Sequence, residues 1–273
     1  LTARVMVNRL WQHCFGTGLV PTANDFGLLG EAVSNQALLD WLAVEFMESG
    51  WDIKHMLRLM MTSSTYQMSV QAQAEALSID SQNRLHWRHN PRRLTAEEIW
   101  DTLLLVRGKL NYDFGGEPVR PKMPEAVLAG SSRPDIAWPE TVGEVANRRA
   151  VYIAVKRSIQ LPLLAAYDAP QRDATCPTRF ATTVPTQALT MLNSERVNNA
   201  AKEFAAQLVN SHGDLNSQII AAFKQALGRA PSVKEKVALL ELSDDLDKIY
   251  SVSRSNLLER ICLVLLNLNE TIY

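Results

Sequence analysis

The sequence predicts a mainly α-helical fold that carries one small β element and a long irregular insert in its middle. Apolar residues recur at helical spacing on both sides of the insert, as in the stripe from Leu215 to Leu227. β-branched and aromatic residues succeed one another in 149–156, which we interpret as a strand. The stretch 111–147 is rich in proline and glycine, and it is too long for a plain connection.

Helices in the first part of the chain are expected at 1–14, 35–49 and 53–63. Ser34 is predicted to cap the second of these at its start, and Gly50 to stop it. Asp52 is predicted to cap the third. Between 15–34 and again between 71–83 the residues are typical of loops.

Capping signals continue in the second part of the chain. Thr95 and Glu98 form a capping-box pattern ahead of an apolar helix that Gly108 closes. The strand at 149–156 needs a partner, for which we expect the segment 118–123. The later elements are helices from 161 onward with a break at 168–184, a second capping box at Ser232 and Glu235, and a final helix at 253–267.

Composition narrows the classes of function. With 47% hydrophobic residues the chain can bury a sizeable core. The formal net charge is −1, so the sequence does not favour binding to nucleic acid, which needs a basic excess. No apolar run reaches the length of a membrane-spanning helix.

The cysteines and histidines do not predict a cofactor or a metal site. Cys14, Cys176 and Cys262 have neither the pattern of a disulfide framework nor that of a zinc site, and the sequence Cys-x-x-Cys-His is absent. His86 and His89 would share a face on a helix, but a catalytic zinc needs a third ligand. We therefore expect no metal and no covalent haem in this chain.

Polar residues among apolar ones form the first candidate site. Asn8, Arg9 and His13 lie on the first helix, Asp25 follows in the loop, and Arg179 and Gln187 lie in a later segment. Such groups need hydrogen-bond partners when they are buried. Two interpretations stay open, namely a network that ties the N-terminal helices to the C-terminal half, or a polar pocket between the two halves.

A second candidate site is a cluster of arginines that contains no acidic residue. Its members are Arg84, Arg88, Arg92 and Arg93. The cluster could bind an anion such as a sulfated glycan. Alternatively, each arginine pairs with a carboxylate from elsewhere in the fold.

Several motifs in order resemble a known family. They include Arg4-Val-Met-Val-Asn-Arg-Leu-Trp-Gln-His, Asn24-Asp-Phe-Gly, Gly50-Trp, Arg92-Arg-Leu, Asp168-Ala-Pro, Cys176-Pro-x-Arg and Thr183-Val-Pro-x-Gln-Ala-Leu. This pattern resembles the planctomycete-specific domain one family, also called domain of unknown function 1553. Cys14 departs from it, because a second histidine is usual there, and this weakens any metal site built on a histidine pair.

The resemblance implies a setting rather than a reaction. It implies that residues 1–273 form one family domain of a longer exported protein, located in the periplasm or cell envelope, whose upstream domains include a cytochrome-c-like one. Haem is then expected only upstream, and the expected partners are those upstream domains and polysaccharide. Within the chain we expect sub-parts at 1–110, 111–157 and 158–273.

Two hypotheses about function follow. The first is a non-enzymatic module of a haem-associated protein that docks on other domains or associates with a glycan. The second is a glycan-acting enzyme with its site between the two helical halves, lined by the residues of the first candidate site. The sequence leaves open whether the protein is an enzyme, and which reaction or substrate it would have.

Overall fold

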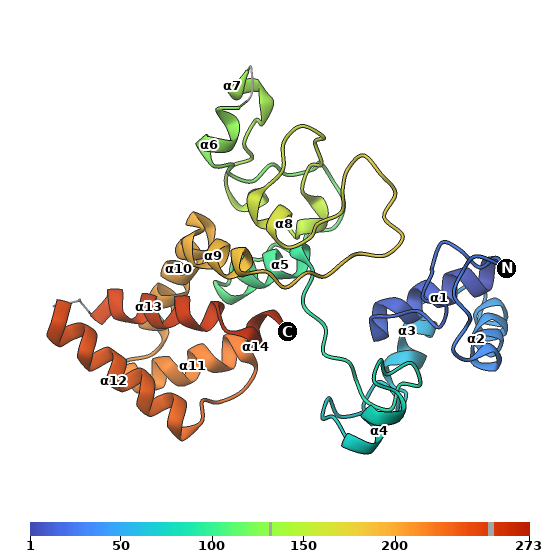
Figure 1. Ribbon diagram of the computed structural model, residues 1–273. Coiled ribbons are helices and arrows are strands. Elements are labelled where there is room, and N and C mark those ends of the chain that lie inside the picture. Colours follow the sequence, from blue (N-terminus) through green and yellow to red (C-terminus); the bar gives the residue numbers. More distant parts are fainter. Residues whose placement is uncertain (131–132, 251–253) are drawn as a thin grey trace. The chain divides into compact units, whose positions relative to one another are not determined.

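The computed structural model describes residues 1–130, 133–250 and 254–273, and in it the chain forms two compact units (Figure 1). The first unit is Leu1–Arg92 and the second is Arg93–Tyr273. Each unit has its own hydrophobic core. The fold is mainly α-helical, which confirms the predicted class.

The first unit is built from short helices around one core. Its helices are α1 (Thr2–Phe15), α2 (Gln36–Glu48), α3 (Ile53–Met61) and α4 (Ala74–Ile79). Helix α1 packs against α2 and α3. The buried side chains between them include Trp11, Phe15, Phe46 and Met56. The polar stretch 71–83, which we expected to be a loop, contains the short helix α4.

The ends of these helices follow local signals. The side chain of Asp52 accepts hydrogen bonds from the backbone N–H groups of Lys54 (2.9 Å) and His55 (3.1 Å), which confirms it as the cap of α3. Gly50 takes a φ of 72° directly behind α2, as the predicted stop requires. The cap of α2 is Asn35 rather than the predicted Ser34, because the Asn35 side chain reaches the N–H of Leu38.

The second unit holds a helical bundle and an irregular region. Its described helices and 3₁₀ turns are α5 (Ala96–Val106), α6 (Glu125–Leu128), α7 (Pro134–Ala137), η1 (Glu144–Asn147), η2 (Ala150–Tyr152), α8 (Pro162–Ala166), α9 (Pro185–Asn193), α10 (Glu195–Ser211), α11 (Leu215–Leu227), α12 (Val233–Tyr250), α13 (Arg254–Leu266) and α14 (Asn269–Ile272). Ser253, the expected start of the last long helix, lies outside the described residues.

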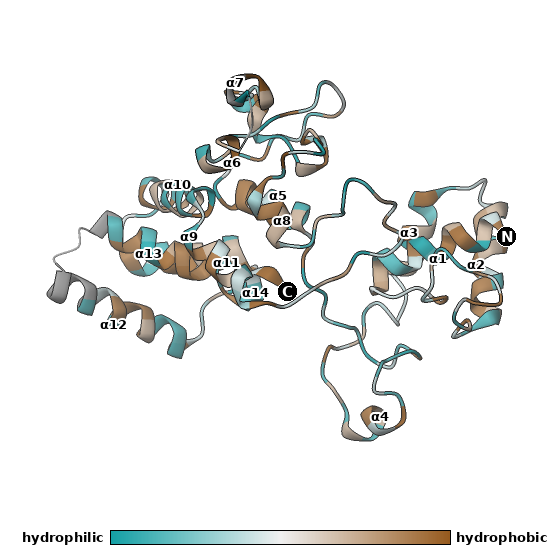
Figure 2. Ribbon diagram, turned by 45° about the horizontal axis from the view of Figure 1, so that its top comes forward, coloured by the Kyte–Doolittle hydropathy of each residue, from teal (hydrophilic) through white to brown (hydrophobic). Residues whose placement is uncertain are grey.

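Helix α13 is the centre of this bundle. It packs against α10, α11 and α12, and the apolar residues along α11 and α13 are visible as brown segments in Figure 2. Phe204, Phe223 and Ile261 are fully buried there. Helix α5 packs against α8 and α10 and buries Trp100. The α10–α5–α8 arrangement positions the pocket described below.

Both predicted capping boxes are present. Thr95 and Glu98 bond reciprocally, with the Glu98 carboxylate 2.7 Å from the Thr95 N–H. Ser232 and Glu235 do the same at the start of α12. These motifs need only residues within one turn, so the sequence predicts them directly.

The predicted strand at 149–156 is wrong. The segment forms the 3₁₀ turn η2, and its pairing is limited to two isolated bridges, one between Val119 and Ile153 and one between Lys156 and Ile159. The expected partner segment is nevertheless the one in contact, since the N–H of Val119 donates to the Tyr152 carbonyl at 2.8 Å. Pro118 and Pro121 lack an N–H group, and they prevent that segment from extending the pairing into a ladder.

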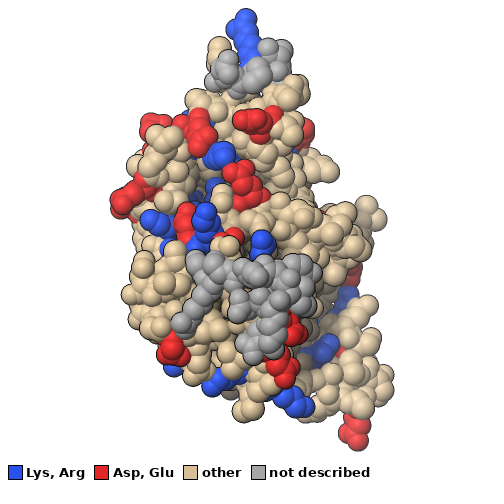
Figure 3. Space-filling view, turned by 90° about the vertical axis from the view of Figure 1, so that its left-hand side faces the viewer, with Lys and Arg blue, Asp and Glu red and all other residues tan. Residues whose placement is uncertain are grey.

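On the face drawn in Figure 3, basic and acidic side chains are interspersed rather than sorted by sign. Among the described residues, no helix combines the length and the hydrophobicity needed to cross a membrane.

Candidate ligand-binding pocket

Asn8 supports the loop that follows α1. Its side chain is fully buried. The carboxamide accepts from the Val20 N–H at 2.8 Å and donates to the Val20 carbonyl at 2.9 Å, so one side chain satisfies both backbone groups of that residue. A Cβ at Gly18 would lie 2.8 Å from the Asn8 side chain, which explains why glycine is needed there.

The other candidate residues of the first unit have local contacts near the surface. Arg9 donates to the Asn24 side chain at 3.1 Å, and His13 is exposed. The Asp25 carboxylate accepts from the N–H of Gly27 at 2.8 Å and so forms a turn. These contacts all lie within the first unit.

The arginine-rich segment is not a helix. Arg84, Arg88 and Arg92 lie in turns and extended backbone at the end of the first unit, whereas Arg93 begins the second. Arg84 forms an ion pair with Glu31 at 2.5 Å. The guanidinium of Arg88 lies 5.0 Å from the centre of the Trp87 ring.

His86 is partly buried among aromatic rings. Its Nε2 accepts a hydrogen bond from the indole N–H of Trp11 at 3.3 Å, and its ring meets those of Trp11 and Phe15 edge-on. Burial lowers the pKa of His86, although the charge of Asp80 opposes this shift. Within the described ranges, no group of three His, Cys, Asp or Glu side chains is arranged to hold a metal ion.

Arg93 and Gln187 belong to one network in the second unit. The guanidinium of Arg93 donates to the Asp168 carboxylate at 2.8 Å, to the Tyr167 carbonyl at 3.2 Å and to the Thr182 carbonyl. Asp168 also accepts from the N–H and the hydroxyl of Thr182 at 2.8 and 2.9 Å. Gln187 donates to the Thr182 hydroxyl at 3.2 Å. Gln187 comes from the first candidate site and Arg93 from the second, and the sequence did not predict that the two residues share one network.

The network closes the base of the 168–182 loop. Burial alone raises the pKa of the Asp168 carboxyl, but the hydrogen bonds from Thr182 and Arg93 outweigh burial and lower it below its ordinary value. Farther along the loop, Arg179 is exposed and forms two hydrogen bonds with Glu97, at 2.5 and 3.1 Å. Gln187 and Arg179 therefore hold the loop in place.

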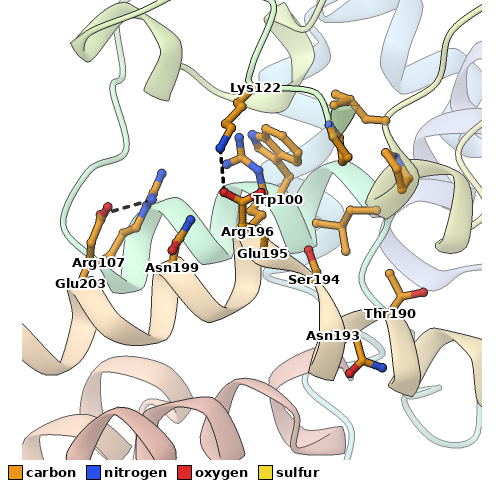
Figure 4. A pocket seen from close by; sticks show the side chains of 14 residues that line it. Trp100, Arg107, Lys122, Thr190, Asn193, Ser194, Glu195, Arg196, Asn199 and Glu203 are labelled. Carbon is orange, nitrogen blue, oxygen red and sulfur yellow. Dashed lines mark hydrogen bonds and ion pairs between the residues drawn. The ribbon is translucent and has the colours of Figure 1, made fainter. Parts of the chain in front are cut away.

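A pocket of about 510 Å³ lies elsewhere in the second unit (Figure 4). It is bounded by α5, α9, the first three turns of α10 and the segments around Lys122 and Leu163. Its lining residues are Trp100, Arg107, Lys122, Pro124, Leu161, Pro162, Leu163, Thr190, Asn193, Ser194, Glu195, Arg196, Asn199 and Glu203. None of them is in either candidate site that the sequence suggested.

Arg196 is the central charged residue of this pocket. Its guanidinium carbon lies 3.4 Å from the centre of the Trp100 ring, and Trp100 itself is 1% exposed. Within the described part of the chain, the guanidinium makes no ion pair and no hydrogen bond. Burial lowers the pKa of Arg196 to about 9, and the neighbouring charge of Arg107 acts in the same direction, whereas the charge of Glu203 opposes the shift.

The other charges of the pocket are paired. Lys122 and Glu195 form an ion pair at 2.7 Å, and both side chains are exposed. Arg107 pairs with Glu203 at 3.2 Å and donates to the Asn147 side chain at 3.1 Å. Figure 4 shows the two pairs side by side along α10, with Asn199 between them. Three basic and two acidic side chains line the pocket, which leaves a charge of +1 (3 − 2).

This arrangement suits the binding of an anion. Arg196 is the uncompensated charge, and its N–H groups have no acceptor within the described residues. The indole N–H of Trp100 and the Nε–H of Arg107 are buried without an acceptor among the same residues. A ligand that accepts hydrogen bonds would complement the guanidinium of Arg196.

The sequence contains no motif that marks these lining residues. Arg196, for example, directly follows Glu195 at the start of an ordinary helix. Its role depends on Trp100, which another helix brings beneath it. A cation over an aromatic ring is a tertiary contact. The sequence of a single chain therefore could not have identified this site.

The fold and the site together define a mainly helical protein with a pocket of net positive charge in its second unit. The chain belongs to the family of proteins of unknown function described as PSD1 (DUF1553), whose family model matches residues 1–243. No curated protein and no solved structure matches the chain significantly.

Proposed function

We propose that this chain is a non-enzymatic docking module of an exported, haem-associated multidomain protein. Its pocket would receive an anionic group from an upstream domain of the same polypeptide. The observation that carries the proposal is the uncompensated guanidinium of Arg196 in the pocket. The haem-associated and exported setting comes from the family resemblance, and docking requires no cofactor in this chain.

The energetics of Arg196 favour a partner that brings negative charge. A partly buried charge without a counter-ion destabilises the fold, and the lowered pKa of Arg196 expresses this penalty. An anion from a docked domain would remove the penalty and make charge-assisted hydrogen bonds. The stabilisation would appear only in the docked state, which is what a docking site needs.

Binding fits the pocket better than acid–base catalysis on a glycan does. Glycosidases need one carboxyl that is protonated and can donate. The hydrogen bond from Lys122 instead lowers the pKa of Glu195, which keeps this carboxyl ionised. Glu203, the other acid of the lining, is paired with Arg107.

Isothermal titration calorimetry with the separately produced upstream region of the parent polypeptide tests the docking function. We expect association that weakens as salt increases and that falls about tenfold in Arg196→Met. Arg260→Met is the matched control, because Arg260 is an exposed arginine on α13. Absence of association at low salt, or equal affinity in Arg196→Met, would contradict the proposal.

A second candidate function is association with an acidic polysaccharide. The side chains of Thr190, Asn193, Ser194 and Asn199 line the same pocket and offer donors and acceptors to sugar hydroxyls. A thermal-shift screen with neutral and acidic oligosaccharides at low and high salt tests it. A ligand at a hundredfold excess over its Kd stabilises by about 2.7 kcal/mol. A salt-resistant shift with one acidic oligosaccharide would support this function, and no shift would exclude it.

A further inference from the structure

We infer that the pocket recognises a single carboxylate attached to an apolar group, and that Arg196 binds this carboxylate through its edge. The inference rests on the proposed function, which requires only an anion, and it names the chemical class of that anion. Four features lead to this inference. They are the orientation of Arg196, the apolar wall of the pocket, the net charge of its lining and the pairing of the other basic side chains.

The orientation of Arg196 determines which of its groups are available. The 3.4 Å separation places the flat face of the guanidinium against Trp100, so the ring covers one face. The N–H groups lie in the guanidinium plane, and they donate in a fork that matches the two oxygens of a carboxylate. Stacking on Trp100 fixes this plane before a ligand arrives, which reduces the entropy lost on binding.

The pocket also has an apolar wall. Pro124, Leu161, Pro162 and Leu163 line it together with Trp100. Leu161 and Leu163 are buried in the core, whereas Pro124 and Pro162 are exposed and available to a ligand. Burying apolar area against them stabilises by roughly 25 cal/mol per Å². A hydrocarbon group beside the carboxylate would gain this contribution, and a bare inorganic ion would not.

The charge of the lining selects a monoanion. With three basic and two acidic side chains, one negative charge brings the pocket to neutrality. A dianion such as a phosphate ester would leave a net negative charge next to Glu195 and Glu203. Like charges at this distance repel each other, and a strongly hydrated dianion also loses more solvation against an apolar wall.

Lys122 provides an internal comparison. It is a basic residue of the same pocket, but Glu195 already compensates its charge at 2.7 Å in solvent. Exposed pairs of this kind contribute little to stability or binding. If the uncompensated charge is what binds the ligand, removal of Arg196 must have a much larger effect than removal of Lys122.

The test uses phenylacetate as the probe, with phenylacetamide as its uncharged isostere and, at about pH 8, inorganic phosphate as a dianion. Binding is measured by calorimetry, and the site is identified from the indole N–H signal of Trp100 in ¹⁵N NMR spectra, assigned with Trp100→Phe. We expect phenylacetate to shift this signal, and phenylacetamide and phosphate to leave it in place. The comparison uses wild-type protein and therefore does not depend on whether a variant folds.

The variants then separate charge from geometry. We expect Arg196→Met to weaken phenylacetate binding by about tenfold to a hundredfold, and Arg196→Lys by about tenfold because it keeps the charge and loses the fork. Lys122→Met should change the affinity by less than about threefold. Equal binding of phenylacetamide, tighter binding of phosphate, or equal effects of Arg196→Met and Lys122→Met would overturn the inference.

The two proposals fail in different ways. If the upstream region binds but phenylacetate does not, docking stands and the carboxylate inference falls. If phenylacetate binds at Trp100 and the upstream region does not associate, the carboxylate site stands and the docking function falls.

Discussion

Arg93 and Asp168 form an ion pair, 2.8 Å between Nη2 and Oδ2, at the base of the 168–182 loop. The Arg93 side chain is 5% exposed and that of Asp168 is 22% exposed, so the pair is largely removed from water. Asp168 also accepts hydrogen bonds from Thr182 at the other end of the loop. One carboxylate therefore connects the start of the second unit to both ends of the loop.

Replacing this carboxylate should destabilise the second unit. Asp168→Ala leaves the buried Arg93 without its counter-ion, and we expect the free energy of unfolding to fall by about 3 kcal/mol. Urea unfolding followed by tryptophan fluorescence measures the change. Asp173→Ala is the control, because Asp173 forms an exposed pair with Arg157. A loss no greater than that of the control would show that the Arg93–Asp168 pair does not stabilise the loop.

Substitution of Asn8 should destabilise the first unit, as substitution of Asp168 destabilises the second. Asn8→Leu leaves the N–H and the carbonyl of Val20 without partners, at a cost of about 1–3 kcal/mol for each group. Asn24→Ala, which removes only the exposed contact with Arg9, should change stability by less than about 0.5 kcal/mol. Chemical denaturation of the two variants checks the difference, and similar values for both would contradict the role of Asn8.

Acid should weaken the first unit through His86. Its pKa in the folded protein is below the ordinary value of 6.5, because burial favours the neutral form. The unfolded chain therefore takes up the proton first, and stability present above about pH 6.5 is lost as the pH falls below that value. Protonation also removes the acceptor for the Trp11 indole N–H.

Thermal unfolding at pH 7.5 and 5.5 measures this dependence. His86→Phe should flatten the difference in Tm between the two pH values, although it lowers stability at pH 7.5 by about 1 kcal/mol through loss of the hydrogen bond. His13→Gln, a change at an exposed histidine, should keep the wild-type dependence. If the Tm of His86→Phe depends on pH as strongly as that of the wild type, groups other than His86 cause the dependence.

Arg196 should be required for ligand binding but not for the stability of the folded protein. Its pKa of about 9 is below the value of an unburied guanidinium, so the charge is less favourable in the folded state. Arg196→Met keeps an apolar stem over Trp100 and removes the charge. We therefore expect a Tm no lower than that of the wild type, in a differential scanning calorimetry experiment without ligand.

The matched variant is Arg229→Met. Arg229 pairs with Glu235 at 2.7 Å and with Glu270 at 2.6 Å, and these carboxylates raise its pKa. Removing it should lower the Tm, because both carboxylates lose their partner. If Arg196→Met lowers the Tm as much as Arg229→Met does, Arg196 serves the fold rather than a ligand.

The sequence alone predicted the features that depend on neighbours within one helical turn. Asp52 caps α3, and the reciprocal bonds of Thr95 with Glu98 were expected from spacing. The mainly helical class followed from apolar periodicity in the same way. Even the error at α2 is small, because the cap moved by one residue from Ser34 to Asn35.

Tertiary structure decided everything that depends on residues distant in the chain. The run 149–156 has the composition of a strand, yet two prolines in the segment 118–123 leave a single bridge between the two segments. Arg93 finds Asp168, and Arg196 lies over Trp100, only because packing of the helices brings these residues together. Spacing along one chain carries no information about such contacts, since they are set by which helix faces pack into a common core.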